Sequence, residues 1–161
     1  MATVRARPGT KNVKDAARVD VQVMKPGKYE VQQDHTFEVV IYLVPTGKRW
    51  MVVDGPGRNV EKETVIFRMW RYHEAVELRK KATIYDRLRR MHVVDTDALN
   101  RLKIQKYLVS WTFDKDNPRL KLHRVNDALT DESWDMFSKN LYPNITSRIV
   151  DEMNKVFELN G

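Results

Sequence analysis

Cysteine is absent from the 161 residues of this chain, and its absence excludes two structural classes. A small domain held by disulfides needs paired cysteines, and a zinc site of the thiolate kind needs cysteine ligands. The chain also has no apolar run near the roughly 18–20 residues that a membrane span requires, and no apolar stretch follows its charged N-terminus. We therefore expect a protein of a reducing compartment, without a membrane span or a secretory signal.

Patterns typical of catalytic and cofactor sites are missing as well. The four histidines show none of the H-x-x-x-H or H-E-x-x-H spacings of metal sites: His35, His73, His92 and His123. Gly47-Lys48 lacks the longer G-x-x-x-x-G-K-[ST] frame of a phosphate loop, so it is expected to be a turn. No serine lies in a G-x-S-x-G frame. These absences predict that the chain is not an enzyme and has no cofactor and no metal.

Basic residues outnumber acidic ones, and they are distributed unevenly along the chain. The formal net charge is +7. Residues 1–18 carry five basic side chains against one acidic, and residues 68–92 carry eight against three. Residues 126–161 reverse this balance, with three basic against seven acidic. A basic front and an acidic rear suit head-to-tail contact between copies or ordered neighbours, and solvated faces are the alternative interpretation.

Two groups of basic residues are the candidate partner-binding sites. The first lies in the N-terminal arm and the second in the middle of the chain: Arg5, Arg7, Lys11 and Lys14, and Arg79, Lys80, Lys81, Arg87, Arg89 and Arg90. On helices, the second group would present several cations together, and Tyr72 and Tyr85 could stack on bases. No recognised nucleic-acid motif accompanies them, and the acidic C-terminal region opposes extended contact with the phosphate backbone of a nucleic acid. We therefore favour a protein–protein face, since arginine with Trp and Tyr is typical of interface anchors, and keep nucleic acid as the alternative partner.

The apolar pattern predicts an α+β fold with a small antiparallel sheet in about residues 18–70. Residues 1–17 show no periodicity and predict an extended basic arm. Four segments have the alternation or the β-branched and aromatic composition of strands: 19–23, 37–44, 50–53 and 64–70. The arm is expected to lead into a single domain, 18–161, whose second part, 71–161, is helical and packs on the sheet.

Four helices are expected in that second part. The first covers 73–81, and the second begins at an Asp95 or Thr96 cap and runs into Trp111. This second helix has apolar residues on two sides, which marks it as the structural centre. A third helix is expected after Thr130. The last is the clearest, because five apolar residues share one face: Ile145, Ile149, Met153, Val156 and Phe157.

Three short segments in this half carry a resemblance to a known family. In chain order they are Ser110-Trp111-Thr112-Phe113, Leu120-Lys121-Leu122 and Leu129-Thr130-Asp131-Glu132. They follow a sheet and two helices and precede two amphipathic helices. This order resembles small tail proteins of tailed bacteriophages, in particular tail assembly chaperones and related baseplate-hub assembly subunits. The resemblance covers about residues 64–159.

The resemblance implies a non-catalytic assembly protein of a phage tail, found in the virion or in the cytoplasm of the host bacterium. Its implied partners are other tail or baseplate proteins in a larger assembly, with the tape-measure protein as the client of a chaperone. Such chaperones are commonly acidic and mostly helical, whereas this chain is basic with a β-rich front. We therefore keep two interpretations, a structural tail or baseplate subunit and an assembly chaperone. A basic nucleic-acid-binding protein of the virion or of host takeover is the alternative.

Overall fold

The computed structural model describes residues 29–31 and 35–160, with side chains described as far as Glu158. Every element named below belongs to the second of the two units into which the chain divides, residues 33–161. The predicted arm and the predicted strand at 19–23 lie outside the described residues, and so do Arg5, Arg7, Lys11 and Lys14.

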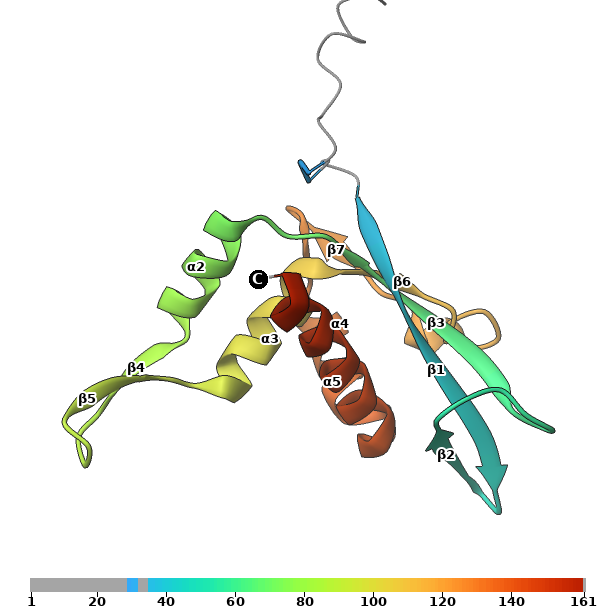
Figure 1. The fold of residues 1–161 in the computed structure, drawn as a ribbon. Coiled ribbons are helices and arrows are strands. Elements are labelled where there is room, and N and C mark those ends of the chain that lie inside the picture. Colours follow the sequence, from blue (N-terminus) through green and yellow to red (C-terminus); the bar gives the residue numbers. More distant parts are fainter. Residues whose placement is uncertain (1–28, 32–34, 161) are drawn as a thin grey trace, which may run out of the picture. The chain divides into compact units, whose positions relative to one another are not determined.

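A four-stranded antiparallel sheet forms the framework of this second unit (Figure 1). Its order is β2-β1-β3-β6, and its strands are β1 (Thr36–Thr46), β2 (Arg49–Val53), β3 (Glu61–Arg68) and β6 (Leu108–Trp111). Alternate apolar side chains of β1 and β3 are buried, as expected when one face of a sheet covers a core: Val39, Ile41, Leu43, Val65 and Phe67. The predicted antiparallel sheet is confirmed.

The predicted turn at Gly47-Lys48 is also present, and it joins β1 and β2 into a hairpin. Thr46 pairs with Arg49, so Gly47 and Lys48 form a two-residue turn and not a phosphate loop. Gly47 has φ +62°, and glycine reaches this left-handed region without the steric cost that a Cβ brings. A glycine at the first turn position is typical of the tight turns that match the twist of paired strands.

The part of the chain that the structure describes contains four helices, which completes the predicted α+β fold. They are α2 (Tyr72–Lys81), α3 (Thr96–Tyr107), α4 (Asp131–Asn140) and α5 (Pro143–Asn160). Asp95 caps α3, since its carboxylate accepts a hydrogen bond from the Ala98 amide at 3.1 Å. Thr130 caps α4 in the same way, through the Ser133 amide at 3.2 Å.

The last helix packs on the sheet as its sequence pattern predicts. It contacts β1 and β2, and four of its apolar residues are buried: Ile145, Ile149, Met153 and Phe157. Val156 lies at the edge of the core and is partly exposed. Phe157 stacks on Trp70, which follows β3, with ring centroids 3.4 Å apart. This helix therefore joins the sheet to the α2–α3 side of the core.

The second half is less helical than predicted. Besides β6 it contains β4 (Thr83–Asp86), β5 (Met91–Val94), β7 (Arg124–Val125) and β8 (Ala128–Leu129). The short β7–β8 hairpin turns at Asn126 and Asp127, both with positive φ, which these two residue types tolerate better than most. The predicted helical part at 71–161 contains its four helices, but these strands, which the prediction did not include, alternate with them.

The central helix also ends earlier than predicted. Helix α3 stops at Tyr107, and the next four residues form β6, which pairs with the edge of β3. The backbone polar groups of β6 thereby gain partners on the sheet, and this tertiary pairing overrides the helical pattern of the sequence. The end of the strand is fixed by Trp111, which is buried and whose Nε1 donates to the Leu120 carbonyl at 2.7 Å.

Candidate binding site: the β4–β5 hairpin

A two-stranded antiparallel hairpin joins α2 to α3 and belongs to a separate sheet from the central one. In Figure 1 it runs outward from the ends of these two helices. Its base is closed by a backbone hydrogen bond of 2.8 Å from the Asp95 amide to the Ala82 carbonyl, and Ala82 is buried. The strands then pair up to Asp86 and Met91, which leaves residues 87–90 as the connecting loop. We call residues 87–90 the hairpin tip.

The hairpin tip is held in shape by its own side chains and backbone. One carboxylate oxygen of Asp86 accepts hydrogen bonds from the Leu88 amide at 2.9 Å and the Arg89 amide at 3.1 Å. The other oxygen lies 3.7 Å from Arg89 Nε. Arg90 closes the loop with φ +54°. Because the loop is already ordered, a partner that binds it loses less conformational entropy than with a floppy segment.

Apolar side chains gather on this hairpin although it is surrounded by solvent. Leu88, at the hairpin tip, is 97% exposed. Ile84, Tyr85 and Met91 are each about half exposed, so four of the nine large hydrophobic side chains exposed in the described part of the chain lie here. Scattered exposed apolar residues are ordinary, but a cluster of them marks an interaction surface.

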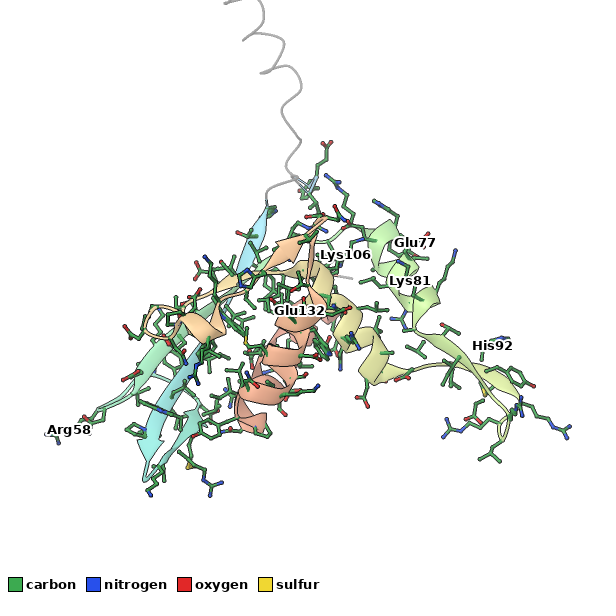
Figure 2. The ribbon with its side chains drawn as sticks, turned by 180° about the vertical axis from the view of Figure 1, so that it is seen from behind. Arg58, Glu77, Lys81, His92, Lys106 and Glu132 are labelled. Carbon is green, nitrogen blue, oxygen red and sulfur yellow. The ribbon has the colours of Figure 1, made fainter. Side chains whose placement is uncertain are left out.

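The two faces of the hairpin differ in chemistry. Tyr85 lies opposite His92 in the strand register, and their rings meet edge to face with centroids 5.3 Å apart. Figure 2 labels His92 on this hairpin. Ile84 lies opposite Val93, and Met91 shares their face because side chains alternate along a strand. The hairpin therefore presents one aromatic and one aliphatic face.

The six predicted basic residues of the middle region lie in two clusters. Arg79, Lys80 and Lys81 form the last turn of α2, and Arg87, Arg89 and Arg90 lie at the hairpin tip. Lys81 and Arg87 are six residues apart in the chain, so at about 3.3 Å per residue along a strand the clusters are separated by up to roughly 20 Å. The first cluster lies on the predicted helix, whereas the second lies in a loop and not on a helix. The structure places three arginines around Leu88 instead.

The strands of this hairpin carry a sequence signal that the prediction of a helical second half overlooks. Both strands are rich in β-branched and aromatic residues, which is typical of strands: Thr83-Ile84-Tyr85 and Met91-His92-Val93-Val94. The segment between them lacks the Gly or Asn that usually marks a hairpin turn. Arg90 adopts the left-handed conformation in their place. The charges are visible in the sequence, whereas the exposure of the apolar residues is not.

A concave site lies between α2, α3 and α5. It is a cavity of about 180 Å³ whose lining includes Trp70, Phe157, Lys103 and Glu158. The Lys103 ammonium donates to Asn154 Oδ1 at 2.9 Å and lies 4.6 Å from the centre of the Phe157 ring. Burial and nearby Arg79 lower the pKa of Lys103, while Glu158 opposes this shift. These groups already contact one another, so the cavity is best explained as part of the packing.

Within the described residues, no group of three or more His, Cys, Asp or Glu side chains could hold a metal ion. No helix in the same part of the chain has both the length and the apolar composition for a membrane crossing. Comparisons with protein-family models, with curated proteins and with solved structures found no match. The hairpin therefore stands on its own geometry as the candidate functional site.

Proposed function

We propose that this chain is a non-catalytic assembly protein that binds another protein through the β4–β5 hairpin. The observation that carries this proposal is Leu88, which is 97% exposed at the hairpin tip between arginines on both sides. Placing a large apolar side chain in water brings no benefit to the isolated fold. It becomes favourable when a partner buries it, by roughly 25 cal/mol for each Å² removed from water.

The surrounding groups favour a protein partner. Arginine, tyrosine and methionine are enriched in protein interfaces, and here Tyr85 and Met91 are half exposed beside the arginines of the hairpin tip. A two-stranded hairpin is only marginally stable by itself, and its open edges offer backbone groups for pairing. A partner with an apolar recess and an acidic rim matches these features.

The setting of this proposal comes from the resemblance to phage tail proteins. On this basis the partners are other tail or baseplate subunits, and the location is the virion or the host cytoplasm. If the chain is a chaperone, its client is the tape-measure protein. A structural subunit and a chaperone differ in one observable. Mass spectrometry of purified particles detects the former and not the latter.

Because the chain lacks cysteine, Leu88→Cys provides one reactive thiol for a photo-crosslinker at the hairpin tip. We expect this probe to couple the chain to a tail or baseplate subunit during assembly, since position 88 lies in the proposed interface. Ser147→Cys is the matched control, because Ser147 is exposed on α5 away from the hairpin. Equal yields at positions 88 and 147 would contradict the proposal.

Nucleic acid remains the second candidate because six cations and the Tyr85–His92 ring pair lie on or beside the hairpin. If six cations contact phosphates, raising the salt concentration from 50 to 200 mM should weaken DNA binding by roughly 10³-fold. A DNA titration at both salt concentrations measures this loss. The Arg87→Glu variant should bind DNA more weakly, and its affinity should depend less on salt. Weak binding that is insensitive to both changes would dismiss this candidate.

A further inference from the structure

A groove at the other side of the same unit has the features that the hairpin tip requires of a partner. It lies between the central sheet, the segment after β6 and the start of α5, with a volume of about 410 Å³. Its apolar lining includes Leu43, Trp50, Phe113 and Ile145. A volume of this size is within the range of about 300–1,000 Å³ that binding pockets occupy.

The charged residues of the groove lining are all acidic. Glu61, Glu63 and Asp116 line it, and no arginine or lysine of the described chain does. Glu63 is buried and already paired, since Lys115 Nζ donates to it at 2.9 Å, which raises the pKa of Lys115. Glu61 and Asp116 are exposed and close enough to the Lys115 ammonium to contribute to its raised pKa, but neither forms an ion pair with another described residue. Both carboxylates can therefore meet cations of a partner at the rim.

We propose that this groove receives the hairpin tip of a second copy of the chain. The inference rests on the proposed function of the hairpin and names its partner. Leu88 would enter the apolar floor, while the arginines on either side of it would meet Glu61 and Asp116. Burial of an apolar anchor inside a charged rim is the arrangement found at the energetic centres of protein interfaces.

A copy does not fill its own groove with its own hairpin. No residue of β4, β5 or the hairpin tip lines the groove. In both views the hairpin and the β1–β2 end of the sheet lie on opposite sides of α3 and α5 (Figures 1 and 2). The contact between copies is therefore head-to-tail. Such a contact uses two different surfaces and builds a closed ring or an open filament, according to the rotation between neighbours.

The test is sedimentation velocity on the wild-type chain and two variants. The hairpin variant is Arg87→Glu with Leu88→Asp, and the groove variant is Glu61→Lys with Asp116→Lys. All four positions are exposed, so both variants should fold. We expect the wild type to associate as its concentration rises, into a closed ring of two or more copies or into a filament. Each variant alone should remain a monomer, because each lacks one of the two surfaces.

Mixing the two variants gives the sharpest outcome. The intact hairpin of the groove variant can enter the intact groove of the hairpin variant, and the chain then has no further surface to use. An equal mixture should therefore form dimers and stop there. As matched controls, Lys155→Glu and Glu132→Lys change exposed charges on α5 and α4 and should leave association unchanged.

Three results would overturn the inference. The first is a wild type that stays monomeric up to about 1 mM, a concentration at which contacts as weak as about −4 kcal/mol are half-populated. The second is that either variant associates as the wild type does. The third is that the mixture of the two variants forms no dimers. None of these results touches the crosslinking experiment at position 88. If position 88 crosslinks to a different subunit while the wild type stays monomeric, the proposed function holds and the self-contact is wrong.

Discussion

Replacing Trp111 by alanine is expected to lower the free energy of unfolding by about 3–5 kcal/mol, the usual cost of truncating a large buried aromatic side chain. Trp111 is buried at the end of β6 and packs against Phe113 and Phe137, with ring centroids 5.3 and 6.1 Å away. The truncation leaves a cavity among these rings. It also removes the donor to the Leu120 carbonyl. Urea unfolding followed by circular dichroism measures the loss.

Trp111→Phe separates the two contributions. Phenylalanine keeps most of the apolar volume and lacks the Nε1 donor, so the expected loss is about 1–3 kcal/mol, the cost of one unpaired buried polar group. An alanine variant no less stable than the phenylalanine variant would show that Trp111 does not fill the core between β6 and α4.

Glu74→Gln is expected to lower the free energy of unfolding by about 2 kcal/mol, somewhat less than the roughly 3–5 kcal/mol of a fully buried pair. Glu74 joins three elements. Arg68 at the end of β3 lies 3.3 Å from one of its oxygens, and Lys106 on α3 lies 3.9 Å from the same oxygen. The Arg71 amide donates to the other oxygen at 2.9 Å, at the start of α2. Glutamine leaves the largely buried Arg68 without its counter-charge.

This effect should depend on pH. Burial opposes ionisation of Glu74, but the hydrogen bonds from Arg71 and Arg68 and the nearby cations outweigh it and lower its pKa below 4.5. A lowered folded-state pKa gives stability that is present above the unfolded value and lost as the pH falls through the folded one. The difference between wild type and Glu74→Gln should therefore be full near pH 7 and shrink below about pH 4.5.

Glu77→Gln is the matched control, because Glu77 lies on the same helix and is exposed (Figure 2). Its effect should stay within about 0.5 kcal/mol, as for most surface substitutions. A Glu74→Gln effect that equals this control, or that persists unchanged in acid, would contradict the role of the Arg68–Glu74–Lys106 cluster. That cluster holds the start of α2 to α3, the two helices that carry the hairpin.

The sequence predicts well the parts of this fold whose pattern and surroundings agree. Helix α5 repeats its apolar residues at helical spacing, and four of the five are buried. The central strands alternate clearly, and the caps at Asp95 and Thr130 accept the amides that their positions predict. In each of these cases the local preference and the tertiary contact favour the same structure.

Prediction from the sequence is incomplete where a distant contact decides the structure. The backbone of residues 108–111 continues a helical pattern, but pairing with β3 turns it into a strand. At the hairpin, the arginines are predicted as a charge cluster because charge is visible in composition. Leu88 is not, because its exposure depends on a turn that Arg90 closes in a conformation rare for that residue. The site therefore combines a predicted charge with an unpredicted shape.

Hydrogen exchange of residues 83–94 tests the central claim most directly. It is measured by mass spectrometry on the isolated chain and on the assembly that the proposed function expects, the chain bound to the subunit that crosslinks at position 88. In the isolated chain, the amides of the hairpin tip should exchange rapidly, except those of Leu88 and Arg89, which donate hydrogen bonds to Asp86. In the assembly, the account predicts slower exchange for every amide of the hairpin tip. Equal exchange of this segment in both states would show that the hairpin stays uncovered, and the claim that it binds a protein would be wrong.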